Sequence, residues 1–130
     1  MQTKLLCQKY LNALNEGSLE VVLSLFEEGA IVHSPLYGET KAESFYQELF
    51  ADTSKSVTQL IQTYEPTDGS LSCAMLFHYQ WTLTTGKVVE FDCMDVFELN
   101  QEQTRFTKLK IIYDTAFLRS DFAKSHKRSQ

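Results

Sequence analysis

The second half of the chain alternates apolar and polar residues over long stretches, and this constrains the fold more than any other feature. A period of two is typical of β-strands, and turn sequences such as Asp68-Gly69 and Thr85-Gly86 separate the stretches. Long strands joined by tight turns form an antiparallel sheet. We therefore predict strands over residues 56–64, 70–84, 87–99 and 104–113.

The first half of the chain has the spacing of amphipathic helices, in which apolar residues recur every three or four positions. Gly17 and Gly29 are placed to end two of these helices, and Ser18 is placed to cap the second. Thr40 and Glu43 have the spacing of a capping box at the start of a third helix. We predict helices over residues 3–15 and 19–27, a short strand over 30–34, and a third helix that ends at residue 50.

This order of elements predicts an α+β domain, in which a cone-shaped, curved antiparallel sheet packs on three N-terminal helices. A sheet that bends around helices encloses a cavity. The chain has 130 residues, 43% of them hydrophobic, and no linker-like or repeated segment, which fits one domain. We predict this domain over residues 1–118, followed by a flexible basic tail over 119–130 that contains His126.

The composition argues against several classes of partner. The net charge is -5 and the dense basic run lies in the tail, so we expect no nucleic-acid groove. No apolar run approaches the ~20 residues of a membrane span and no signal peptide is visible, so we expect no membrane contact and a cytoplasmic location. Cys7, Cys73 and Cys93 lack metal-site spacing, and we expect reduced, buried thiols with no metal and no cofactor.

The strand over residues 91–99 carries an acid on an apolar face. Because alternate residues share one side of a sheet, Asp95 lies with Phe91 and Cys93. If this side is the core, Asp95 is a carboxyl in an apolar pocket that either finds a partner or stays protonated. Such a carboxyl is a candidate functional group. If the opposite side is the core, Asp95 is a solvated residue, and the strand alone does not decide between the two.

Four segments carry a resemblance to a known superfamily. They are residues 10–20 (YLNALNEGSLE), 25–35 (LFEEGAIVHSP), 95–100 (DVFELN) and 109–114 (LKIIYD). Together with the order of predicted elements, they resemble the nuclear-transport-factor-2-like superfamily, and within it the SnoaL-like polyketide cyclases and the ketosteroid isomerases. The resemblance implies a cavity between the curved sheet and the helices, and a homodimer packed through the outer sheet face.

The resemblance implies roles for Tyr10 and Asp95, which match the two residues that donate hydrogen bonds to a substrate oxyanion in the isomerases. The Asp that serves there as general base is replaced by Ser34, whose hydroxyl is a poor base at neutral pH. The adjacent His33 would supply a base if the strand end turned inward, although alternation places it on the opposite face.

Asp114 matches a catalytic acid in the epoxide-hydrolase branch of the superfamily. With Asp95 it would form a pair of carboxylates that activates water. The match is incomplete, because Cys93 stands where that branch has an Arg. The same alternation places His78 on the outer face of the sheet.

Strand alternation and helix spacing also predict the walls of the cavity. Aromatic walls with a few polar groups are typical of small-molecule sites, although interiors are usually filled by their own side chains. The predicted pocket residues are Phe26, Val32, Tyr37, Tyr46, Phe50, Met75, Phe77, Tyr79, Trp81, Phe91, Cys93, Phe97, Leu109, Ile111 and Tyr113.

The sequence therefore predicts a protein that binds a small apolar or partly polar ligand. One hypothesis is an isomerase- or cyclase-like enzyme that stabilises an enolate through Tyr10 and Asp95. Another is a noncatalytic ligand-binding or assembly domain, which the replacement at Ser34 favours. A third is water activation by Asp95 and Asp114. Whether the chain is an enzyme stays open at this point.

Overall fold

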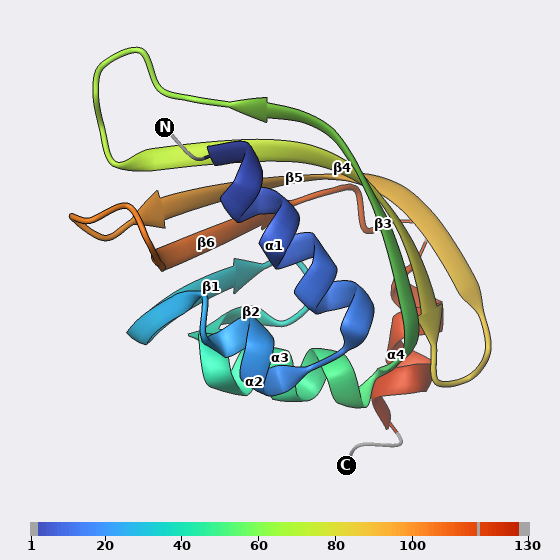
Figure 1. Cartoon of the computed structure of the whole chain (residues 1–130). Coiled ribbons are helices and arrows are strands. Elements are labelled where there is room, and N and C mark those ends of the chain that lie inside the picture. Colours follow the sequence, from blue (N-terminus) through green and yellow to red (C-terminus); the bar gives the residue numbers. More distant parts are fainter. Residues whose placement is uncertain (1–2, 117, 128–130) are drawn as a thin grey trace.

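A curved sheet wraps around the first helix of the protein (Figure 1). The computed structural model describes residues 3–116 and 118–127. The sheet has six strands in the order β2-β1-β6-β5-β4-β3. Its elements are α1 (Thr3–Glu16), α2 (Leu19–Leu23), β1 (Phe26–Ser34), β2 (Gly38–Lys41), α3 (Ala42–Ala51), β3 (Thr53–Tyr64), β4 (Ser72–Leu83), β5 (Val88–Leu99), β6 (Phe106–Ile112) and α4 (Arg119–Lys127).

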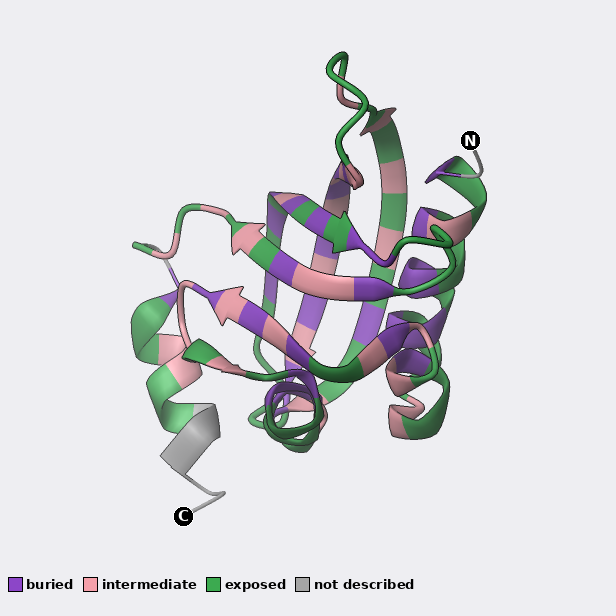
Figure 2. Cartoon of the chain, turned by 90° about the vertical axis from the view of Figure 1, so that its left-hand side faces the viewer, coloured by how far each residue is buried: buried purple, intermediate pink, exposed green. Residues whose placement is uncertain are grey.

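The two central strands have one buried face each. Every second residue is buried from Cys73 to Leu83 in β4 and from Val89 to Leu99 in β5, and Figure 2 shows this alternation along the strands. The buried face of both strands points toward the helices, and Asp95 lies on it with 1% of its surface exposed. The predicted α+β cone is confirmed, and Asp95 is on the core side of its strand.

An aromatic cluster joins the first helix to three strands. The rings of Phe97 and Phe106 stack with centroids 3.9 Å apart, and Tyr10 of α1 meets Phe97 edge to face at 5.4 Å. Phe26 of β1 packs against Phe106 at 5.3 Å. Because these residues come from α1, β1, β5 and β6, their contacts fix the position of α1 inside the curved sheet.

The boundary between α2 and β1 differs from the prediction. The helix ends at Leu23 rather than residue 27, and β1 begins at Phe26 rather than residue 30. Phe26 pairs with Phe106 of β6, so the chain is already extended where the apolar spacing also fitted a helix. Gly29 has a φ of 82° within an irregular stretch of β1, where it permits a bulge instead of ending a helix.

Two further details of the sheet correct the prediction. Strands β1 and β6 run parallel, so the sheet is not wholly antiparallel. The short strand β2 pairs with β1, with Thr40 opposite Val32, and α3 therefore begins only at Ala42. Lys41 is the N-cap residue and makes no side-chain capping bond, so the predicted capping box at Thr40 is not formed. The third strand starts at Thr53, three residues earlier than predicted.

A fourth helix stands where the sequence predicted a flexible tail. Helix α4 begins at Arg119, and the preceding Leu118 is fully buried while Phe122 is half-buried against the core. In Figure 1 it lies beside the far, curved end of the long strands. The side chain of His126 and residues 128–130 lie outside the described residues. Within the part of the chain that is described, no helix is long and apolar enough to cross a membrane.

We predict that Phe97→Ala lowers the free energy of unfolding by about 3–5 kcal/mol, because it removes a fully buried ring from the aromatic cluster. Urea denaturation checks this. The neighbouring Glu98 faces solvent, and Glu98→Ala as the matched control should change the stability by less than about 0.5 kcal/mol. Equal losses in the two variants would contradict a stabilising role for the cluster.

Candidate functional site

A small pocket lies between α1, α3 and the inner face of the sheet. Its volume is about 30 Å³, close to the share that one water molecule occupies in the liquid. Its walls are mostly aromatic, so a bound molecule would contact ring faces. The lining residues are Tyr10, Leu14, Ser34, Tyr37, Phe45, Leu49, Phe77, Tyr79, Trp81, Phe91, Cys93, Asp95, Ile111 and Tyr113.

Asp95 is the carboxyl that lines this pocket. Its neighbours across the sheet are Met75 of β4 and Ile111 of β6, both apolar. Among the described side chains, Cys93 is its hydrogen-bond partner, and the Cys93 thiol donates to Asp95 Oδ1 over 3.3 Å. Burial raises the pKa of Asp95 to about 7, and the bond from Cys93 opposes this only partly. At neutral pH the carboxyl is therefore poised to give or take a proton.

Tyr10 reaches the same pocket from α1. Its hydroxyl lies 2.6 Å from the hydroxyl of Tyr46 on α3, and either oxygen can be the donor. Burial, followed by the nearby phenol of Tyr46 and the carboxyl of Asp95, raises the pKa of Tyr10 well above its usual value, so Tyr10 is a neutral phenol. When Tyr46 donates to Tyr10, the Tyr10 proton is left to bind an oxygen in the pocket.

The polar atoms of three other wall residues are held by groups outside the pocket lining. Each of these rings therefore presents its apolar face to the pocket while its polar atom is hydrogen-bonded. These bonds run between Tyr37 and Asp52 at 2.6 Å, between Tyr79 and Ser56 at 2.8 Å, and between Trp81 and Thr53 at 2.8 Å. Asp52 is fully buried, and no pattern in the sequence marked it.

The three weaker site candidates from the sequence have other roles. Ser34 lines the pocket, but its hydroxyl oxygen accepts hydrogen bonds from the backbone N–H groups of the two residues after Pro35, which positions the turn after β1. His33 lies on the opposite face of β1, with Nδ1 3.4 Å from Glu39 Oε1, so the inward turn is absent. Asp114 is exposed and accepts a hydrogen bond from the N–H of Ala116.

The predicted pocket residues divide into two groups. Those that line the pocket are Tyr37, Phe77, Tyr79, Trp81, Phe91, Cys93, Ile111 and Tyr113. The others pack in or against the core and do not line it, namely Phe26, Val32, Tyr46, Phe50, Met75, Phe97 and Leu109.

Leu14, Phe45 and Leu49 also line the pocket and were not predicted to do so. The spacing of Phe45 and Leu49 on α3 marks them as buried, but it does not say which cavity they meet.

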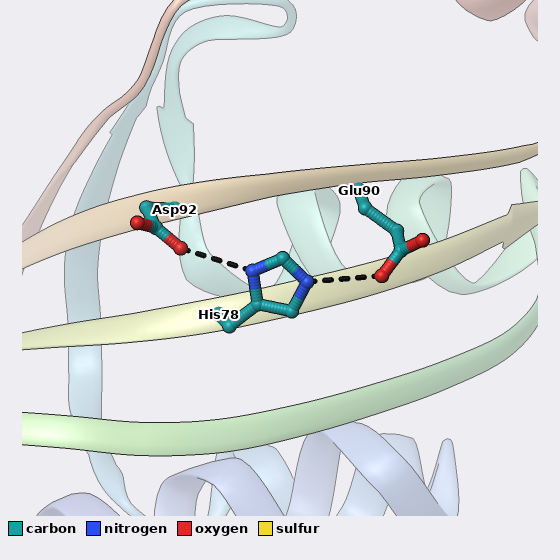
Figure 3. Close-up of polar contacts among 3 residues, drawn as sticks. All are labelled: His78, Glu90 and Asp92. Atoms are coloured by element: carbon teal, nitrogen blue, oxygen red, sulfur yellow. Dashed lines mark hydrogen bonds and ion pairs between the residues drawn. The ribbon is translucent and has the colours of Figure 1, made fainter.

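The outer sheet face carries a charged cluster. His78 lies between two carboxylates, with Nδ1 2.9 Å from Asp92 and Nε2 3.0 Å from Glu90 (Figure 3). The hydrogen bond to Glu90 and then that to Asp92 raise the pKa of His78. This favours the protonated imidazole, in which both nitrogens donate. Alternation predicted the outward position of His78 but not its two partners.

Within the described residues, no three His, Cys, Asp or Glu side chains come together so that they could hold a metal ion. The pocket's own side chains include a carboxyl with a raised pKa, Asp95, and phenols that can donate hydrogen bonds.

A family comparison agrees with the shape of the fold. The model of the SnoaL-like domain family matches residues 7–107 of the chain. None of the curated proteins matches the sequence.

Solved structures share the fold at low sequence identity. PrhC from Penicillium brasilianum has a TM-score of 0.79 at 14% identity, over 99% of this chain and 90% of PrhC. TerC, crystallised with polyporic acid, has a TM-score of 0.76 at 13% identity, over 95% of this chain and 99% of TerC. SalBIII, an epoxide hydrolase/cyclase-like enzyme in pyran ring formation, has a TM-score of 0.72 at 17% identity, over 87% and 91% of the two chains.

The raised pKa of Asp95 predicts a pH dependence of stability. The folded state keeps its proton up to about pH 7, whereas the unfolded carboxyl ionises near pH 3.9. The contribution of Asp95 to the free energy of unfolding is therefore fully present below about pH 4 and is lost as the pH rises through about 7. We predict that Asp95→Asn gains stability relative to wild type over this interval, measured by denaturation at a series of pH values.

The control for this measurement is Asp114→Asn, which changes an exposed carboxylate. Its stability difference from wild type should stay nearly constant with pH. A constant difference for Asp95→Asn as well would mean that Asp95 is not protonated in the folded protein.

Proposed function

Because the chain belongs to the SnoaL-like domain family, we propose that its pocket binds a small, mostly apolar molecule with a carbonyl group and moves a proton on it. The observation that carries this proposal is Asp95, a carboxyl among aromatic walls whose pKa burial raises to about 7. A group with this pKa is near the optimum for acid–base catalysis at neutral pH. The expected reaction class is isomerisation or cyclisation through an enolate.

The proposed reaction has two proton transfers. In the first, the carboxylate of Asp95 takes a proton from a carbon next to the ligand carbonyl. The negative charge then develops on the carbonyl oxygen, where the hydroxyl of Tyr10 donates a hydrogen bond, and Tyr46 holds Tyr10 in place. In the second, the protonated Asp95 returns its proton to another carbon of the enolate.

In this proposal Asp95 is the general base, because Ser34 replaces the Asp that serves as the base in the isomerases. The hydroxyl of Ser34 already accepts two backbone hydrogen bonds, and His33 is paired on the other face of the sheet. The pair of carboxylates that water activation requires is not assembled, because Asp114 is exposed and does not line the pocket. Proton transfer by a single carboxyl therefore fits the geometry better than epoxide hydrolysis.

The structural neighbours support a small-molecule pocket in this fold. TerC was crystallised with polyporic acid, and SalBIII is an epoxide hydrolase/cyclase-like enzyme. The free, buried cysteines, Cys7, Cys73 and Cys93, fit a reducing compartment, and we propose a cytoplasmic location on that basis.

Proton transfer can be tested without the natural substrate. We predict that the protein catalyses deuterium exchange next to the carbonyl of 2-tetralone, an apolar enolisable ketone, measured by proton NMR. Asp95→Asn should abolish this exchange, and Tyr10→Phe should slow it by about 10²–10³-fold, because it removes an oxyanion donor. The wild-type rate should rise with pH and level off above the pKa of Asp95, about 7.

Matched controls are Asp114→Asn and Tyr64→Phe, which change an exposed carboxylate and an exposed phenol. Both should exchange at the wild-type rate. Binding of 2-tetralone without exchange in the wild type would support the noncatalytic ligand-binding domain instead.

We also propose that two copies pair through the outer sheet face. Its centre is apolar, with Leu76 opposite Met94 and Met94 opposite Ile112 in neighbouring strands. Ile112 is 48% exposed, and an isolated chain would leave this patch in water.

The charges on this face favour a second copy as the partner. Glu90 and Asp92 lie on one side of Met94 along β5. Lys108 and Lys110 lie beyond its other side, on β6, where Lys108 pairs with Glu98 and Lys110 leaves this side with a net positive charge. A two-fold axis that crosses the strands at Met94 brings the acidic side of each copy over the basic side of the other.

We predict that Met94→Lys converts the dimer into a monomer, because it places two lysines against each other at the two-fold axis. Light scattering coupled to size-exclusion chromatography measures the mass. Gln8→Lys adds the same charge on the exposed side of α1 and should leave the dimer intact. A wild-type mass equal to one chain at all concentrations would refute the dimer.

A further inference from the structure

The pocket around Asp95 has a buried side and a side that reaches solvent. Tyr10 and Asp95 belong to the buried side, with 2% and 1% of their surfaces exposed. Tyr37, Ile111 and Tyr113 also line the pocket but are only half-buried. The phenol of Tyr113 is near enough to Tyr37 to help raise its pKa, so these residues lie together. A ligand too long for the enclosed volume can extend past them toward solvent.

Tyr113 differs from the other phenols of the pocket in its hydrogen bonding. The hydroxyls of Tyr10, Tyr37 and Tyr79 each form a hydrogen bond of 2.6–2.8 Å with another side chain. The hydroxyl of Tyr113 has no hydrogen-bond partner among the residues that the structure describes. A pocket hydroxyl without a protein partner keeps its full capacity to donate and accept for a bound molecule.

The ring of Tyr113 is nevertheless held in a defined place. It stacks on Phe91 of β5, with centroids 4.4 Å apart and an angle of 24° between the ring planes. Ile111 pairs with Asp95 across the two strands, and Tyr113, two residues further on, continues this register beside Cys93.

The surroundings of Tyr113 keep it a neutral phenol. Burial raises its pKa, and nearby groups that include Cys93 and Asp95 raise it further. The hydroxyl is therefore a hydrogen-bond donor at physiological pH, and it lies within electrostatic reach of the pocket's thiol and carboxyl.

We propose that the hydroxyl of Tyr113 donates a hydrogen bond to a second oxygen of the ligand, other than the carbonyl oxygen at Tyr10. The two phenols enter the pocket from different sides, since Tyr10 comes from the buried face of α1 and Tyr113 follows the end of β6 at the half-buried side. The ligand class is a mostly apolar ring ketone that carries a hydroxyl or a second carbonyl group at its outer end. This inference rests on the ligand pocket of the proposed function and not on the proton transfer.

The test compares two ketones that differ by one hydroxyl group. They are 2-tetralone and 6-hydroxy-2-tetralone, in which the hydroxyl lies at the end of the molecule opposite the carbonyl. Dissociation constants are measured by NMR titration of the nitrogen-labelled chain. The indole N–H of Trp81 is a suitable reporter, because Trp81 is the chain's single tryptophan and lines the pocket. The wild type should bind the hydroxyketone about 3–10-fold more tightly, because one further hydrogen bond forms.

Tyr113→Phe removes the hydroxyl and keeps the ring. This variant should bind both ketones with the affinity that the wild type has for 2-tetralone. Since the hydroxyl has no partner among the described residues, the variant should unfold at the wild-type urea concentration. The matched control is Tyr64→Phe, which changes an exposed phenol on β3 and should keep the wild-type preference. A wild type without the preference, or a Tyr113→Phe variant that retains it, overturns the Tyr113 contact.

The outcomes for binding and for exchange separate this inference from the proposed reaction. If the preference depends on Tyr113 while deuterium exchange in 2-tetralone fails, the proton transfer is refuted and the Tyr113 contact stands. If 2-tetralone exchanges while Tyr113→Phe binds the hydroxyketone as the wild type does, the contact is refuted and the reaction stands.

Discussion

The inner faces of β4 and β5 must be buried along their whole length, and the rest of the structure depends on this. A strand of twelve residues spans about 40 Å, whereas the fourteen residues of α1 span only about 21 Å. One helix cannot cover a flat sheet of that length, so the strands curve around it. Curvature brings their far ends close to α3 and α4, which cover what α1 does not reach. At Trp81 this cover is the ring of Phe122.

Asp95 is a carboxyl on this otherwise mostly apolar face, and its buried position raises its pKa. The same strand carries Asp92, which points outward by alternation and bonds with His78 in water. Asp95 is turned inward among rings, without a cation among the pocket-lining residues. Burial therefore favours its protonated form, at a cost in stability that grows as the pH rises. Asp95 is a buried carboxyl with a raised pKa and Asp92 is part of a surface ion pair, because their side chains face opposite sides of the sheet.

The strands could be predicted from the sequence because alternation persists over many residues. The start of β1 could not, since Phe26 fits a helical spacing and its extended form is decided by pairing with Phe106. Strand β2 is short and polar, so it has no periodic signal. Helix α4 was missed because its support comes from Tyr37, far away in the chain, on which Phe122 packs.

The sequence by itself determined which residues share a face, and so it marked Asp95 and put His33 and His78 on the other side. Tyr10 became a candidate through the resemblance to the isomerases. Only the tertiary structure decided that the Asp95 face is the core, that Tyr10 bonds to Tyr46, and that the pocket beside them is small. The reason is physical. Periodicity is a local property of the backbone that each segment carries, whereas the distance between two side chains on separate elements depends on how all the elements pack.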